Sequence, residues 1–330
     1  GTMGSQSDAE QLLRVVAALI DKCNPFELCG TLRSNALEAS LIIAAAADKA
    51  STQAPYFQPF ISQVMGSLCA ALVSNDIELL QDGNGGNVPS TSIEPHELAR
   101  GTFVGSWREG PFQCIELNLP WRHHAARVVV GLNISHISSK ESALRVVLSL
   151  VNCLGPDRIA PFLTLESPAL VNTAMQLLDY RFSDTLRLVA SLLVVKLLES
   201  SLALYNQYDQ QQGSLNFGAA AQRLFEMASG GFLGMALSVQ SEMVGTEASS
   251  AGKQRLLSVA YDSLKDCIEL VVAAKADSAS TPVINLPREM VEGVLKNMWE
   301  EVARCITSRR HRRTRRIEPI EGEDDEEGGG

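Results

Sequence analysis

The sequence is poor in aromatic residues, which make up 5% of its 330 positions. Leucine, alanine, valine and serine dominate instead. Sheets are enriched in aromatic and β-branched residues, whereas packed helices favour leucine and alanine, so this composition predicts a mainly helical protein. At this length roughly three quarters of the unfolded surface can be buried, so stability requires neither a metal nor a disulfide.

Cysteines are few and widely spaced, and no two of them form a CxxC pair. The seven are Cys23, Cys29, Cys69, Cys114, Cys153, Cys267 and Cys305. Their number is odd, and most of them fall inside apolar helical runs. This pattern is typical of reduced, buried thiols. No signal peptide or membrane-spanning run is recognised either, so we expect a cytoplasmic and/or nuclear protein that does not associate with membranes.

The sequence also lacks the motifs of common enzymes. We find no Walker-type phosphate loop, no GxSxG elbow, no HExxH and no dinucleotide fingerprint after a strand. His123 and His124 are adjacent, and His136 follows in the same predicted helix, but Arg127 and Lys140 stand where an i+4 ligand would be needed. We therefore expect a protein that is not an enzyme and has neither a metal site nor a cofactor.

The central element is predicted to be a helix from Ser183 to Tyr208. It carries two apolar stripes, so it has to be packed from two sides. Arg187, Lys196 and Glu199 interrupt the run and argue against a membrane span. Helical periodicity predicts further helices at 8–22, 31–49, 56–73 or 60–73, 121–136, 139–154, 157–165, 168–180, 217–227, 233–244, 253–276 and 287–306.

Three segments interrupt this helical pattern. Asp76 to Leu80 is expected to be a short continuation or a separate turn. Residues 81–95 contain glycines, a proline and a serine/threonine cluster, which predict a flexible loop. Residues 102–119 hold two short β-rich runs around Arg108-Glu109-Gly110-Pro111, so this region forms either a small β-hairpin or an extended loop. The Gly230-Gly231 pair is expected to separate two helices.

Successive helices joined by short links pack as antiparallel neighbours, and in this length range the pattern resembles the HEAT and armadillo class of α-solenoid. The resemblance is one of architecture, without a repeated motif. It implies an all-α, irregular helical stack, and a single globular bundle is the competing fold. We assign residues 1–5 to a cloning remnant, 7–308 to one helical domain and 309–330 to a disordered tail.

Two groups of residues are candidates for contact with a partner. The irregular stretch brings together Trp107, Arg108, Phe112, Trp121 and Arg122, a composition found at protein-binding hot spots and also in loops pinned to a core. The tail carries the arginine run Arg309, Arg310, Arg312, Arg313, Arg315 and Arg316, followed by an acidic segment. Such a run is typical of nuclear-import signals, nucleic-acid contacts or solvated tails.

The chain has a net charge of −10, with an arginine run and an acidic tail that nearly cancel each other. An acidic body repels phosphate backbones. We therefore expect a non-catalytic scaffold or adaptor that binds a helix or extended peptide of another protein. The alternative is a helical protein that contacts RNA or DNA through the arginine run or a local basic cleft.

Overall fold

The computed structural model describes residues 58–73, 78–82, 101–119, 127–164, 169–208, 217–243 and 250–277, with the single residues Gln11 and Lys296. The described elements belong to the unit formed by residues 1–284. The predicted helices at 8–22, 31–49 and 287–306 lie outside the described residues, apart from those two positions. The predicted tail lies outside them as well.

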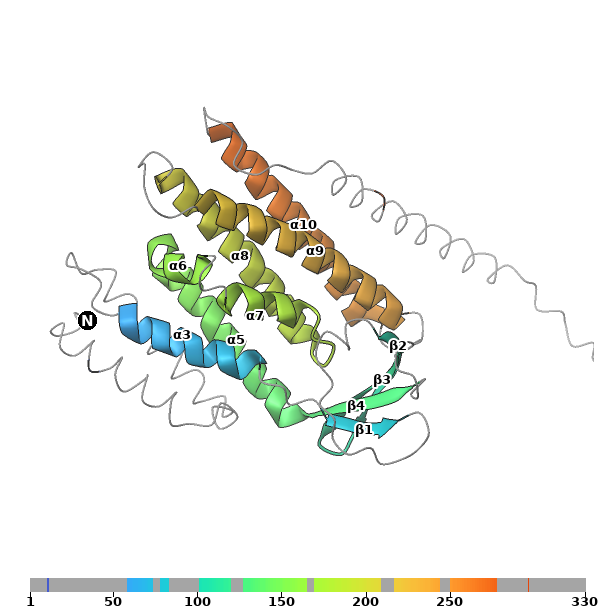
Figure 1. Cartoon of the computed structure of the whole chain (residues 1–330). Coiled ribbons are helices and arrows are strands. Elements are labelled where there is room, and N and C mark those ends of the chain that lie inside the picture. Colours follow the sequence, from blue (N-terminus) through green and yellow to red (C-terminus); the bar gives the residue numbers. More distant parts are fainter. Residues whose placement is uncertain are drawn as a thin grey trace, which may run out of the picture. The chain divides into compact units, whose positions relative to one another are not determined.

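Most of the described residues are helical, which confirms the expected helical character (Figure 1). The helices are α3 (Gln58–Val73), α5 (Ile134–Leu154), α6 (Pro156–Leu163), α7 (Ala169–Leu178), α8 (Asp184–Tyr208), α9 (Phe217–Met243) and α10 (Ser250–Asp277). The bounds of α3, α6, α7, α8 and α10 lie within a few residues of the predicted ones. Helix α5 begins at Ile134, five residues before the predicted start.

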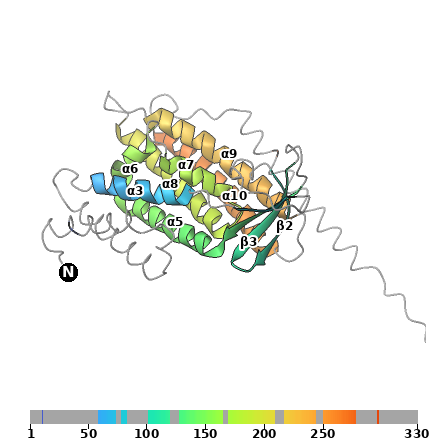
Figure 2. The ribbon, with the colours of Figure 1, turned by 60° about the horizontal axis from the view of Figure 1, so that its bottom comes forward.

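Helix α8 is the centre of this arrangement and contacts α5, α6, α7, α9 and α10 (Figures 1 and 2). Leu186, Leu193 and Leu197 have no exposed surface, as expected for a helix packed from two sides. On the second stripe Leu198 and Leu202 are buried, whereas Leu192 has 57% of its surface exposed. By length and composition α8 could cross a membrane, but its packing is that of a core helix.

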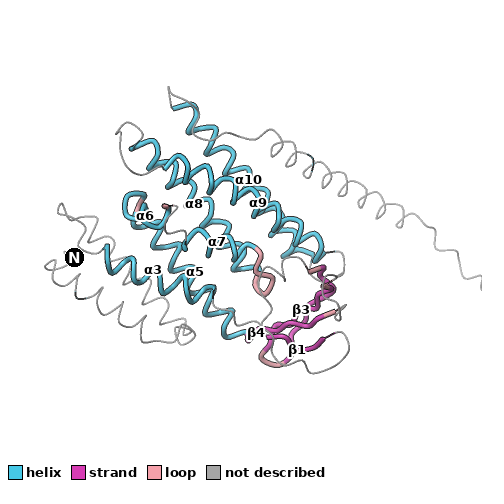
Figure 3. The backbone as a smooth tube through the Cα atoms, in the orientation of Figure 1, coloured by secondary structure: helices cyan, strands magenta, loops and turns pink. Residues whose placement is uncertain are grey.

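A four-stranded antiparallel sheet lies beside the ends of α5 and α9 (Figures 1 to 3). Its strands are β1 (Glu78–Asp82), β2 (Thr102–Glu109), β3 (Phe112–Asn118) and β4 (Val128–Asn133), in the order β1-β4-β3-β2. The hairpin alternative for residues 102–119 is thereby confirmed. The purely α-helical fold is corrected to a helical body with a small sheet.

Two sequence predictions are wrong at this sheet. The helix expected from Trp121 to His136 is instead a strand over Val128–Asn133. Its consecutive valines favour extended backbone, and β4 pairs with β1 along one edge and with β3 along the other. The short helical continuation or separate turn expected at Asp76 to Leu80 is likewise a strand from Glu78. Strand β1 also takes the first two residues of the predicted flexible loop at 81–95, and the rest of that loop lies outside the described residues.

The inner face of the sheet forms a hydrophobic cluster with the adjacent helical segments. Asn133 ends β4 and caps α5, because its side-chain oxygen accepts a hydrogen bond from the Ser135 amide at 3.0 Å. Helix α5 therefore starts directly at the sheet. The cluster contains Phe103, Ile115, Leu117, Leu119, Val128, Val130, Leu132, Ile137 and Phe182.

Helix α9 is continuous, so the break expected at Gly230-Gly231 is wrong. The two glycines have different surroundings. A Cβ atom on Gly230 would meet nothing within 4 Å, whereas one on Gly231 would overlap the Met175 methyl and lie 2.9 Å from Leu178 Cδ1. Gly231 therefore lies where α9 crosses close to α7. The glycine allows close helix packing there and does not end a helix.

This difference makes the two glycines a matched pair for mutation. G230A should leave stability unchanged or raise it by up to about 1 kcal/mol, since alanine is the better helix former. G231A gains the same propensity, but the ends of the Met175 and Leu178 side chains have to move to admit the methyl group, which costs up to about 1–3 kcal/mol. Urea unfolding should therefore rank G231A below G230A. Equal midpoints and slopes for the two variants would show that the Met175 and Leu178 side chains do not restrict the space at Gly231.

Candidate functional site

The β2–β3 hairpin carries three of the five aromatic and arginine residues singled out in the sequence. Its turn is formed by Gly110, with φ at 56°, and Pro111. Trp107 pairs with Cys114 and Glu109 pairs with Phe112. Paired residues share a face, and so do residues two apart along a strand, so Trp107, Glu109 and Phe112 lie on one side of the sheet. We call these three residues the hairpin face.

The hairpin face presents an aromatic ring to solvent. Trp107 is 37% exposed, and its indole Nε1–H donates to Glu109 Oε2 at 3.3 Å. Phe112, half-buried, is the diagonal neighbour of Trp107 across the two strands. Cys114, which pairs with Trp107, is fully buried. The face thus combines an accessible indole with a carboxylate that orients it.

The Arg108 side chain points to the other side of the sheet from those of Trp107 and Phe112. It pairs with Gln113 and lies on the opposite side of the sheet from Trp107. Its side chain is exposed. The structure therefore brings together Trp107 and Phe112 but not Arg108. Trp121, Arg122 and the arginines between 309 and 316 lie outside the described residues, so their roles stay predictions.

The hairpin is attached to the helical body at both of its ends. At the turn, the Ile134 amide of α5 donates to the Pro111 carbonyl at 2.8 Å. At the base, the buried Arg181 donates from Nη1 to the Gly101 carbonyl at 3.0 Å. Arg181 belongs to the short connection between α7 and α8 (Figure 3). These contacts fix the hairpin relative to the helices and so preorganise its exposed face.

A second polar site, which the sequence analysis did not identify, lies inside the helical body. Arg187 of α8 has no exposed surface and makes a two-point contact with Glu242 of α9, at 2.7 Å for Nη2–Oε1 and 3.2 Å for Nη1–Oε2. Lys253 of α10 lies 2.7 Å from Glu242 Oε2 and 2.7 Å from Asp184 Oδ1. We call these four residues the ionic cluster.

The ionic cluster connects three helices, and its Arg187–Glu242 pair is closed to water, whereas Asp184 at its edge is 36% exposed. The Glu242 side chain is 1% exposed and that of Lys253 is 15% exposed. Ser238 adds a further link, since its Oγ accepts from Arg187 Nη2 at 3.2 Å and donates to Glu242 Oε1 at 3.1 Å. Opposite charges compensate each other here, so the cluster fits a structural role. Removing one partner of such a buried pair typically costs about 3–5 kcal/mol.

The pKa values of Glu242 and Asp179 are shifted in opposite directions by their surroundings. Burial alone would raise the pKa of Glu242, but Arg187 and Lys253 together hold that pKa below its usual value. Burial raises the pKa of Asp179, and the attraction of Arg187 and Arg181 offsets part of that increase. Glu242 is therefore the carboxylate that stays ionised as an integral part of the packing.

Among the described residues, no group of three or more histidine, cysteine or acidic side chains could hold a metal ion. The thiol of Cys267 is fully buried, and this burial raises its pKa to about 12. A thiol with so high a pKa is a poor nucleophile at neutral pH, because the reactive form is the thiolate.

Comparison with known proteins gives no assignment of family. No protein-family model matches the chain, and no curated protein matches it. Among solved structures, the crystal structure of Kap121p matches at 12% identity and a TM-score of 0.39, covering 89% of this chain. The chain spans 26% of the length of that structure. A likeness at this level does not establish a shared fold, so the architecture stands on the elements described above.

The ionic cluster predicts a specific pH dependence of stability. Because the pKa of Glu242 is lower in the folded protein, its ionisation stabilises the fold above the unfolded pKa of 4.5, and this contribution is lost as the pH falls through the folded value. E242Q removes the contribution at every pH. The difference in unfolding free energy between wild type and E242Q should be largest near pH 7 and shrink steadily below about pH 4.5.

Urea unfolding at a series of pH values measures this difference. E226Q is the matched control, because Glu226 is exposed on the same helix and should lower stability by less than about 0.5 kcal/mol. A wild-type-to-E242Q difference that does not change with pH would show that the charge of Glu242 does not hold the helices together.

Proposed function

We propose that the protein is a non-catalytic interaction scaffold whose hairpin face binds an extended segment of another protein. The exposed indole of Trp107 on a firmly anchored edge strand is the observation that carries this proposal. Tryptophan is among the residues most enriched at binding hot spots, because it offers a large, rigid contact area. Phe112 and Glu109 complete a face with an apolar centre and a polar margin.

The position of β2 in the sheet favours an extended partner. In the described part of the chain β2 pairs with β3 and with no other strand, so one of its backbone edges has no strand neighbour. Its last four residues, 106–109, are all exposed. An extended peptide could add to this edge through main-chain hydrogen bonds, while Trp107 supplies side-chain contact.

The helical body supports this role as a rigid frame. In the proposal, the antiparallel helices form an irregular HEAT/armadillo-like stack in the cytoplasm or the nucleus. Arg181 and Ile134 join the hairpin to this stack through the Gly101 and Pro111 carbonyls. Rigid support lowers the entropy lost on binding, which favours affinity. The nucleic-acid alternative rests on the arginine run outside the described residues and stays a prediction from sequence.

The proposal predicts site-specific crosslinking at the hairpin. A photoreactive p-benzoylphenylalanine at position 107, irradiated in extract of the native cells, should give a discrete crosslinked protein that mass spectrometry identifies. The same group at position 237 is the matched control, because Leu237 is 56% exposed on α9 and is not part of the hairpin face. Crosslinking of the same proteins at both positions would indicate non-specific contact.

Binding of the identified protein in purified form then tests the residues themselves. W107A should weaken its affinity about thirtyfold, as expected for a hot spot worth about 2 kcal/mol. L237A should change affinity less than about twofold. Unchanged affinity in W107A, with the fold intact by circular dichroism, would remove the hairpin face as the site.

A further inference from the structure

The edge of β2 that has no strand neighbour in the described part of the chain is regular over only part of its length. The pairing of β2 with β3 shifts register between Phe103 and Gly105. Such a bulge bends a strand and increases its twist. From Gly105 to Glu109 the pairing is regular, and residues 106–109 are all exposed. An added strand can therefore follow β2 over the residues 105–109.

The two sides of this stretch carry different chemistry. Gly105, Trp107 and Glu109 lie on the side of the hairpin face, since residues two apart along a strand share a side. Ser106 and Arg108 lie on the other side. A strand that adds to this edge places its residues directly opposite those of β2, and each opposed pair lies on one side of the sheet. The side chains of 105–109 therefore determine which partner residues fit.

The acidic groups on the side of the hairpin face are already engaged within the chain. Glu109 Oε2 accepts a hydrogen bond from Trp107 Nε1 at 3.3 Å. Glu116, which pairs with Gly105, has its Oε1 atom 3.5 Å from Arg127 Nη1. These contacts occupy the two carboxylates, so this side of the edge does not require a charged partner residue.

Arg108, on the other side, has no carboxylate in its own row of the sheet. The row continues with Gln113 on β3 and Leu132 on β4, and neither side chain is charged. The Arg108 side chain is exposed. The position on the free side of Arg108 belongs to the added strand. A carboxylate there would accept two parallel hydrogen bonds from the guanidinium, and opposite charges in a directly opposed pair stabilise strand pairing.

Gly105 leaves open space beside Trp107. A Cβ atom on Gly105 would meet nothing within 4 Å. A glycine inside a strand often marks the place where another chain approaches closely. An aromatic ring on the partner residue opposite Gly105 can lie over this glycine and against the Trp107 indole, which is 37% exposed. Such aromatic pairs add stability beyond the area that they bury.

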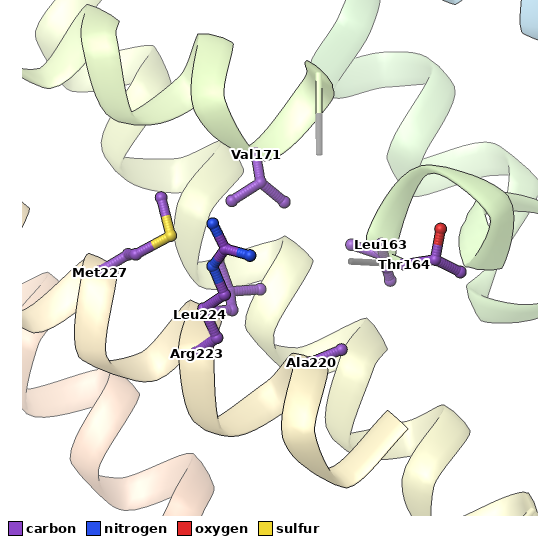
Figure 4. A pocket seen from close by; sticks show the side chains of 7 residues that line it. All are labelled: Leu163, Thr164, Val171, Ala220, Arg223, Leu224 and Met227. Carbon is purple, nitrogen blue, oxygen red and sulfur yellow. The ribbon is translucent and has the colours of Figure 1, made fainter. Parts of the chain in front are cut away.

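An aromatic ring has no comparable place in the cavity between α6, α7 and α9. That cavity, bordered by Leu163, Val171 and Leu224, holds about 20 Å³, which is room for about one water (Figure 4). The open edge of β2 is therefore the better place for an aromatic anchor.

We propose that β2 selects an extended segment that carries an acidic residue opposite Arg108 and an aromatic residue opposite Gly105. The paired strands of the described sheet are all antiparallel, and antiparallel pairs are the more stable kind, so the segment runs antiparallel to β2. In that direction the acidic residue precedes the aromatic residue by three positions, and the residue directly after the acid faces Trp107. This selection rests on the function proposed above, because it concerns the same edge.

The probe is the peptide N-acetyl-Thr-Lys-Glu-Val-Ser-Tyr-Thr-amide, titrated into the full chain labelled with ¹⁵N in its tryptophans. The Trp107 indole signal, identified by its loss in W107F, should shift and saturate with a dissociation constant of about 1 mM or tighter. R108E should weaken binding about fivefold, the effect of one exposed cross-strand ion pair. R145E is the matched control, since Arg145 is exposed on α5, outside the sheet, and should change binding less than about twofold.

A charge exchange separates this pairing from general electrostatics. The peptide with lysine in place of its glutamate should bind R108E about fivefold more tightly than it binds the wild-type chain. Equal affinity for the two chains would overturn the selection of an acidic residue. The peptide with serine in place of tyrosine should bind about threefold more weakly, and unchanged binding would overturn the aromatic contact at Gly105. No shift with the probe up to about 10 mM would overturn the proposal as a whole.

The protein identified by crosslinking distinguishes this inference from the proposed function. Weaker binding of that protein in W107A, with unchanged binding in R108E, would keep the hairpin face as the site and refute the selection proposed here. Unchanged binding in both variants would remove the proposed function and this selection together. The tryptophan spectrum of unliganded R108E reports whether that variant is folded.

Discussion

The structure depends on keeping one guanidinium neutralised in a dry interior. Arg187 has no exposed surface, and an isolated charge in such a place would cost several kcal/mol. The Glu242 carboxylate, on α9, neutralises the charge of Arg187. The second oxygen of Glu242 binds Lys253 of α10. Helices α8, α9 and α10 must therefore meet at a fixed axial position, because any slide along their axes would separate these charges.

This constraint also orders the part of the molecule that faces partners. Helix α8 starts at Asp184, only three residues after Arg181, which donates a hydrogen bond to the carbonyl of Gly101, the residue before β2. The connection between α7 and α8 further contributes Phe182 to the cluster beneath the sheet. Tyr180 packs against the same cluster, and the Lys140 ammonium lies 5.2 Å from the centre of its ring. The short segment from Arg181 to Asp184 thus links the contacts that position the hairpin to the charged contacts that align the helices.

Much of the helical body could be predicted from the sequence. The long helix Asp184–Tyr208 and the helix Ser250–Asp277 follow from apolar periodicity, and the hairpin follows from a turn sequence between two β-rich runs. These features depend on residues that are close together in the chain, so a sequence pattern records them directly.

The remaining features depend on neighbours that are distant in the chain. Strand β4 is buried between two strands and has no polar alternation, so its valines could not be separated from the apolar helix that follows. Gly231 marks a crossing with α7, which its own surroundings in sequence do not reveal. The partnership of Arg187 with Glu242 joins residues 55 positions apart. One feature of the sequence did point to Arg187: it follows Leu186 in an otherwise apolar helix, and both residues are buried.

The route by which β1 enters the sheet has a consequence for the order of folding. Glu78 pairs with Gly131, and the Arg181 contact to Gly101 spans 80 residues, whereas α9 and α10 are consecutive and pack against each other. Closing a long loop lowers the entropy of the chain before any favourable contact forms. Local helix pairs therefore assemble faster than strand pairs that are distant in the chain. Strand β1 is accordingly expected to join the sheet late, after the local hairpin and the consecutive helices have formed.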